Sequence, residues 1–118
     1  MVKSSVEGQL VVHTFKGEFS AYDMVEAKAF VEANCEEDAN HAVLWDLRGA
    51  LLSELDQTYS ALTKAIVNPQ ASSYKRAFLV ASDEDRDRFE TVLGQTTIPW
   101  PWAVFQDEGQ ARDWLTSP

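Results

Sequence analysis

The chain has little cysteine and little positive charge, and each shortage excludes a class of protein. Of its 118 residues only Cys35 is a cysteine, so neither an intrachain disulfide nor a thiolate metal cluster can form. Its 10 lysine and arginine residues stand against 19 aspartate and glutamate residues, which gives a formal net charge of -9. Phosphate backbones and anionic surfaces repel such a chain, so we expect no nucleic acid among its partners.

Long hydrophobic runs and glycine-rich loops are also missing. No apolar run is long enough to span a bilayer, and residues 1–5 lack the apolar stretch of a signal peptide, so we expect a cytoplasmic protein without membrane insertion. The 5 glycines form no phosphate-binding loop. Two expected helix starts, at Asp83 and Asp107, carry carboxylates where a phosphate would bind. The sequence therefore predicts no cofactor.

What the chain does contain is an ordinary globular composition. Hydrophobic residues make up 45% and charged residues 25%, which argues against disorder. A chain of 118 residues is long enough for one hydrophobic core but not for two. We therefore expect residues 1–118 to form a single domain.

Four helix-start signatures divide the chain into strand-then-helix units. In each, a side chain that can accept a bond from a free backbone N–H stands three positions before a residue that can bond back. The four pairs are Ser20 with Asp23, Ser53 with Asp56, Ser82 with Asp85, and Asp107 with Gln110. They predict helices after Ser20 to about residue 36, over about residues 54–67, from Asp83 to near Gly94, and briefly after Asp107.

The segments between these helices predict strands. They are rich in β-branched and aromatic residues and lie near residues 3–7, 10–16, 41–47, 75–81 and 102–105. Gly8 and Gln9 join the first two strands into a hairpin, and Arg48-Gly49 is expected to be a loop. A hairpin followed by repeated βα units predicts an α/β fold, with a mixed sheet of four to five strands and about four helices against it.

Four features of the chain follow one another in the order of a known family. They are Gly17 after the second strand, the block VLWDLRG at residues 43–49, the strand KRAFLV at residues 75–80, and the ending from Val104 to Leu115. In this order they resemble the STAS domain, most closely the SpoIIAA-like branch of small bacterial proteins. The resemblance implies a non-enzymatic module that binds proteins or a small ligand, with helices packed on a mixed sheet.

The resemblance also implies a regulatory serine that this chain does not carry. In the anti-sigma-factor antagonists, an Asp-Ser-Ser-Gly motif opens the helix after the central strand. The corresponding stretch here runs from Ser53 to Asp56, and the motif is absent. Asp56 falls about where the serine would be, either as a fixed carboxylate that imitates phosphoserine or as a capping residue, and capping needs no further assumption.

Trp100 and Trp102 are the best binding candidates in the sequence. Strand alternation puts both rings on one face beside Val104, and the prolines at 99 and 101 confine this end to an edge strand or a loop. Aromatic pairs near an exposed edge anchor a partner or an apolar ligand. The alternative is that both rings cover the core beneath the third helix.

Carboxylates and histidines give a weaker signal. Asp46, Asp56 and Asp83 stand at strand ends or helix starts, where paired carboxylates could bind a metal or do acid–base work. Capping and the helix dipole explain the same residues more simply. His13 and His41 have no metal-ligand spacing, and no nucleophile is paired with them in the sequence, so we expect no metal site.

Three hypotheses of function follow. The first is a regulatory or protein-interaction module, with a protein partner or as a homodimer, that uses the loop at Ser53 and Asp56 and the edge at Trp100 and Trp102. The second is a carrier of a small apolar ligand held between sheet and helices by Trp45, Tyr59, Phe89 and Trp102. The third is an enzyme that uses Asp46 or His13, but we expect no catalysis.

Overall fold

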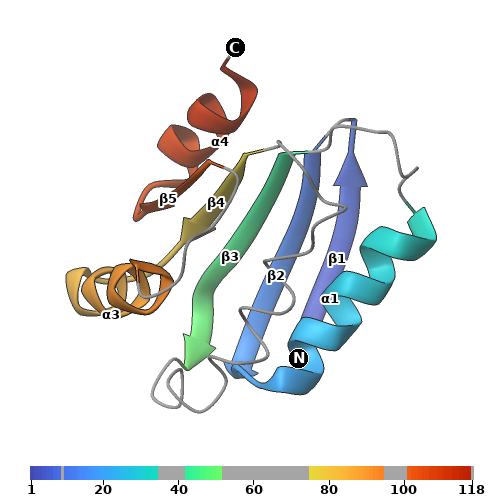
Figure 1. The fold of residues 1–118 in the computed structure, drawn as a ribbon, viewed down its shortest axis with the longest axis horizontal. Coiled ribbons are helices and arrows are strands. Elements are labelled where there is room, and N and C mark those ends of the chain that lie inside the picture. Colours follow the sequence, from blue (N-terminus) through green and yellow to red (C-terminus); the bar gives the residue numbers. More distant parts are fainter. Residues whose placement is uncertain (9, 35–41, 52–74, 95–100, 118) are drawn as a thin grey trace.

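A computed structural model describes residues 1–8, 10–34, 42–51, 75–94 and 101–117 of the chain, which form five strands and three helices. Figure 1 shows their arrangement. In chain order they are β1 (Val2–Glu7), β2 (Leu10–Glu18), α1 (Ala21–Asn34), β3 (Ala42–Leu51), β4 (Arg76–Leu79), α3 (Asp83–Gly94), β5 (Trp102–Phe105) and α4 (Glu108–Thr116). The helix expected over residues 54–67 lies outside the described residues.

The five strands form one mixed sheet in the order β1-β2-β3-β4-β5. β1 pairs antiparallel with β2, and the following pairs, β2–β3, β3–β4 and β4–β5, are parallel. Gly8 turns the chain between the first two strands with a positive φ of 65°, a conformation that glycine adopts without a steric penalty. The predicted hairpin and mixed α/β sheet are confirmed, and β5 is an edge strand as the prolines indicated.

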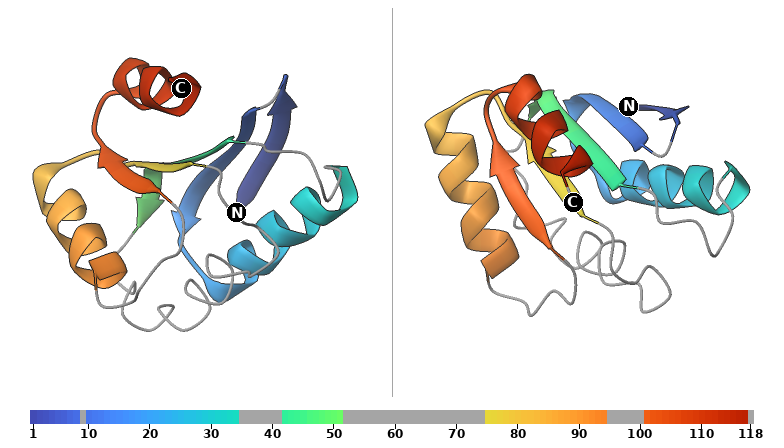
Figure 2. Two further views of the ribbon diagram at one scale, coloured as in Figure 1. Left: turned by 45° about the horizontal axis from the view of Figure 1, so that its top comes forward. Right: turned by 90° about the horizontal axis from the view of Figure 1, so that it is seen from above.

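Helices cover both faces of the sheet. α1 and α3 lie on one face and α4 on the other (Figure 2). We call these the α1 face and the α4 face. The core of the α1 face is rich in aromatic rings and consists of Val11, Phe15, Phe19, Ala27, Val43, Trp45, Leu47, Phe78, Val80, Phe89, Leu93 and Val104. The core of the α4 face is smaller and consists of Leu10, Val12, Leu44, Ala77, Leu79, Ala111 and Leu115.

The alternation of side chains along the strands produces these two cores. In β2, residues 11 and 15 point to the α1 face and residues 10 and 12 to the α4 face. Because both faces are covered, the central strands are apolar almost throughout, which is why residues 42–45 and 77–80 are continuous hydrophobic runs.

The prediction that Arg48-Gly49 is a loop is wrong, because both residues belong to β3. β2 continues beyond the predicted strand to Glu18 and pairs with this segment. The register shifts between the pairs Thr14–Asp46 and Lys16–Gly49, so β3 holds one extra residue in a bulge. A side chain at Gly49 would place its Cβ 3.2 Å from the carbonyl oxygen of Phe15, which favours glycine at this close approach.

Three of the four predicted helix starts are confirmed as caps. Each described signature forms the expected bond between a side-chain oxygen and a backbone N–H three residues on. The N–H groups of Asp23, Asp85 and Gln110 donate to Ser20 (3.4 Å), Ser82 (3.2 Å) and Asp107 (2.9 Å), and the Ser20 N–H donates to the Asp23 carboxylate at 3.3 Å. The fourth signature, Ser53 with Asp56, lies outside the described residues.

Candidate functional site

Three polar side chains are buried side by side in the aromatic core of the α1 face. They are His13 of β2, Trp45 of β3 and Arg76 of β4, which we call the buried polar cluster. The sheet register aligns them, because His13 pairs with Trp45, and Arg76 stands two residues before Phe78, the β4 partner of Trp45. Three adjacent parallel strands therefore place these polar groups on one face of the sheet, on an otherwise apolar surface.

His13 is almost fully buried and makes one polar contact across the hairpin. Its Nδ1 lies 2.7 Å from the hydroxyl oxygen of Ser4, and its ring stands edge-on to Trp45 with centroids 5.5 Å apart. Burial lowers the pKa of His13 to about 4, and the positive charge of Arg76 acts in the same direction. The imidazole is therefore neutral at pH 7.

The pairing of Ser4 with His13 was missed by sequence reasoning, although it follows from the predicted two-residue turn at Gly8 and Gln9. The two residues are opposite one another only because the turn at Gly8 sets the register of the hairpin. The pairing gives His13 the hydroxyl neighbour that sequence spacing did not supply. With a pKa of about 4, however, the imidazole is a weak base for activating that hydroxyl at neutral pH.

Trp45 is held between aromatic rings and has an unsatisfied donor. Its ring stacks on Phe15 at 5.6 Å and 19° and lies 5.6 Å from the ring of Phe78. The side chain is only 3% exposed, and its indole Nε1 is buried without a hydrogen-bond partner. Most buried polar atoms in proteins have a partner, so an orphaned donor needs an explanation.

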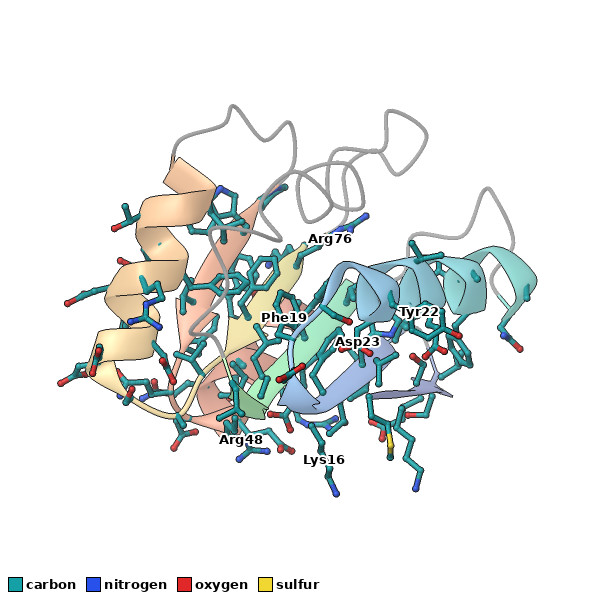
Figure 3. The ribbon with its side chains drawn as sticks, turned by 90° about the horizontal axis from the view of Figure 1, so that it is seen from below. Lys16, Phe19, Tyr22, Asp23, Arg48 and Arg76 are labelled. Carbon is teal, nitrogen blue, oxygen red and sulfur yellow. The ribbon has the colours of Figure 1, made fainter. Side chains whose placement is uncertain are left out.

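Arg76 adds positive charge to the same face. It is buried at the start of β4, and its charge is felt at His13. Figure 3 shows Arg76 on the α1 side of the sheet, whereas Arg48 projects from the opposite side. The apolar pattern of the strand around Arg76 gave no reason to assign it to a site, and sequence reasoning missed it.

Asp46 lies on the α4 face, away from the buried polar cluster. Its carboxylate accepts bonds from the Arg48 side chain at 2.8 and 3.0 Å, and Arg48 also bonds Glu108 of α4 at 2.7 Å. Burial alone would raise the pKa of Asp46, but the bonds and charge of Arg48, together with the charge of Arg112, hold it below its usual range. The structure therefore places Asp46 and His13 on opposite faces.

Of the other described residues that the sequence singled out, two lie in or against the core of the α1 face and one lies apart from it. Trp102 is half-buried and packs, beside Val104, against the core of the α1 face, which confirms the predicted shared face for these two residues. Phe89 belongs to the same core, and Asp83 is exposed at the start of α3. Ser53, Asp56, Tyr59 and Trp100 lie outside the described residues.

A metal-binding group and a membrane-spanning helix were sought in the described part of the chain. Within it, no group of three or more histidine, cysteine, aspartate or glutamate residues is arranged to hold a metal ion. None of the helices described there is both long and apolar enough to cross a membrane.

Comparison with known proteins identifies the fold. No protein-family model matches the chain, and no curated protein matches its sequence. The structure is similar to the crystal structure of an uncharacterized protein of the DUF3478 family with a SpoIIAA-like fold from Shewanella loihica PV-4. The TM-score is 0.60 and the identity 13%, over 98% of this chain and 92% of that one. The chain therefore has a SpoIIAA-like fold, as the resemblance predicted.

Proposed function

We propose that this protein is a non-enzymatic binding domain that holds a small amphipathic molecule against the α1 face of its sheet. The observation that carries the proposal is the buried indole Nε1 of Trp45, which has no hydrogen-bond partner. An unsatisfied buried donor costs about 1–3 kcal/mol. An acceptor oxygen on a bound ligand recovers this free energy, so the orphaned donor favours a ligand over an empty core.

The surroundings of Trp45 define the chemistry of the ligand. The rings of Phe15 and Phe78 favour an apolar body, and Trp102 packs against the same core. The charge of Arg76 favours an anionic head group such as a carboxylate, which also accepts the Trp45 N–H bond. This proposal sharpens the second sequence hypothesis, in which Tyr59 was a further contact.

Two features support a role without catalysis. His13, the candidate base, is neutral and weakly basic because its pKa is about 4. Asp46, the candidate carboxylate, is engaged by Arg48 on the other face of the sheet. A pair that is separated by the sheet does not act on one substrate atom, since acid–base catalysis requires hydrogen-bond reach.

The first hypothesis from the sequence, a regulatory or protein-interaction module, stays a prediction. It depends on the stretch from Ser53 to Asp56, which lacks the Asp-Ser-Ser-Gly motif, and on the edge of β5, where Trp102 is half-buried. A cytoplasmic location in a bacterium belongs to the same set of proposals.

A pair of matched tryptophan variants tests the ligand proposal. In titration calorimetry with sodium dodecanoate, we expect the wild-type protein to bind the carboxylate. Trp45→Phe keeps an aromatic ring but removes the N–H, and should weaken binding about tenfold, which corresponds to about 1.4 kcal/mol.

Trp114→Phe is the control for this experiment. Trp114 packs against the core of the α4 face, so the same change there should leave dodecanoate affinity unaltered. Circular dichroism at the titration temperature checks that both variants are folded. The proposal fails if the wild-type protein takes up no dodecanoate, or if both variants lose the same affinity.

A further inference from the structure

α1 is apolar on two sides, and only one of them faces the sheet. Its inner side contributes Ala27, Phe30 and Val31 to the core of the α1 face. On its outer side Tyr22 is 69% and Val25 63% exposed. A helix that packs by one side normally turns charged residues to solvent on the other.

The other described helices do not share this feature. Among the described residues, the exposed large hydrophobic side chains are Met1, Val6, Tyr22, Val25 and Leu51. Two of these belong to α1, and none belongs to α3 or α4. Tyr22, Val25 and the exposed Ala29 follow one another at spacings of three and four residues, so they share one side of the helix. We call these three residues the outer strip.

Contacts at the start of α1 fix the position of this strip. The Tyr22 hydroxyl bonds Glu26 one turn on, and this bond, with the negative charge of Glu26, raises the pKa of Tyr22. The Met1 ammonium lies 3.1 Å from the Asp23 carboxylate, which places the exposed Met1 beside the first turn. Figure 3 shows Tyr22 and Asp23 together on this helix.

The charge around the outer strip selects the kind of partner. Glu26 is exposed on α1 and Glu18 is exposed just before it, and the sequence of the helix holds one further glutamate, Glu32, against a single Lys28. Asp23 does not add to this charge, because it is buried and paired with the Met1 ammonium. The whole chain carries a net charge of -9, so a second copy would bring like charges together. We infer that the outer strip docks a partner protein that presents an apolar helix face flanked by lysine or arginine residues.

This inference is independent of ligand binding, because the outer strip faces away from the buried polar cluster. The apolar residues of the outer strip, at spacings of three and four, form a surface on which an apolar helix face can pack. The acidic residues beside the strip favour a basic partner. Failure of the dodecanoate titration therefore leaves this inference intact, and the reverse also holds.

Fluorescence anisotropy of a labelled amphipathic peptide built from leucine and lysine tests the inference. We expect the wild-type protein to bind this peptide in moderate salt, and to bind its leucine–glutamate counterpart far more weakly. Val25→Asn removes the central apolar contact without changing charge or helix propensity, and should weaken binding about tenfold.

The control is Thr91→Asn, which introduces the same side chain at an exposed position of α3 and should leave affinity unchanged. Equal binding by both variants would mean that the peptide follows net charge alone, and would overturn the inference. So would equal binding of the glutamate peptide. A wild-type dimer in sedimentation that Val25→Asn dissociates would assign the strip to a second copy instead.

Discussion

At the scale of single residues, burial changes the chemistry that a side chain offers. His13 resembles a candidate base when it is read along the sequence, but in the fold it stands between Ser4 and the ring of Trp45. Removal from water disfavours the charged imidazole, and the nearby Arg76 disfavours it further. His13 is therefore a neutral core residue that satisfies one hydroxyl.

This state of His13 predicts a loss of stability in mild acid. The pKa of His13 is about 4 in the folded protein and 6.5 in its model state, so the unfolded chain binds more protons between these values. The stabilisation is complete above pH 6.5 and is lost as the pH falls towards 4. The difference corresponds to about 3 kcal/mol in the free energy of unfolding.

Urea unfolding at several pH values between 7 and 4 measures this effect, with His13→Asn as the comparison. Asparagine keeps a polar atom near Ser4 but does not titrate, so the variant should lose less stability than the wild type over this range. Carboxylates contribute equally to both proteins. Parallel pH profiles for the two proteins would contradict the assignment of His13.

The sequence predicted which apolar residues share a core better than it predicted which polar residues lie among them. Trp45, Phe89 and Trp102 were expected to line one region, and all three lie in or against the core of the α1 face. Arg76 and the Ser4–His13 pair were missed, because their positions depend on the register between strands. The register of the hairpin follows from its short turn, whereas the register between the parallel strands β3 and β4 depends on tertiary packing.

At the scale of elements, the described helix starts are stabilised by residues close in sequence, whereas the end of α4 is stabilised by a residue far away in the chain. Each described start is capped by its own side chains, so spacing alone predicted it. The end of α4 has no basic residue in its last turn. Instead, Lys75 lies just before β4, and its Nζ donates to the carbonyl oxygens of Trp114 and Ser117, each at 2.9 Å. The same ammonium lies over the Trp114 ring.

Lys75→Met should therefore destabilise the protein by about 1–2 kcal/mol. Methionine keeps an apolar stem against Trp114 but leaves the last carbonyl groups of α4 without their cation. Lys3→Met is the control, because it removes the same charge from an exposed position of β1. Equal losses in thermal unfolding for the two variants would show that Lys75 acts only through net charge.

The end of β3 shows why element boundaries are harder to predict than elements. Arg48 and Gly49 are typical loop residues, yet β3 continues through them because Lys16, Gly17 and Glu18 of β2 pair with residues 49–51. Arg48 lies at the bulge between Asp46 and Gly49 and reaches Glu108 of α4. Tertiary pairing thus overrides the local turn signal.

At the scale of the whole molecule, the order of strands and helices was sufficient to predict the fold. The pattern of a hairpin followed by βα units predicted the mixed sheet. The comparison structure shares a SpoIIAA-like fold with this chain although the two sequences are only 13% identical. At such low identity the likeness shows the fold alone. Fold alone does not give function, so both of our proposals rest on local features, the buried polar cluster and the outer strip of α1.

Native mass spectrometry of the purified protein measures directly whether the α1 face binds a small amphipathic molecule through Trp45. With dodecanoate present, we expect a folded species that carries one bound molecule, and a much smaller bound fraction for Trp45→Phe than for Trp114→Phe. A folded protein whose mass stays that of the chain alone, with dodecanoate in excess, would contradict this expectation.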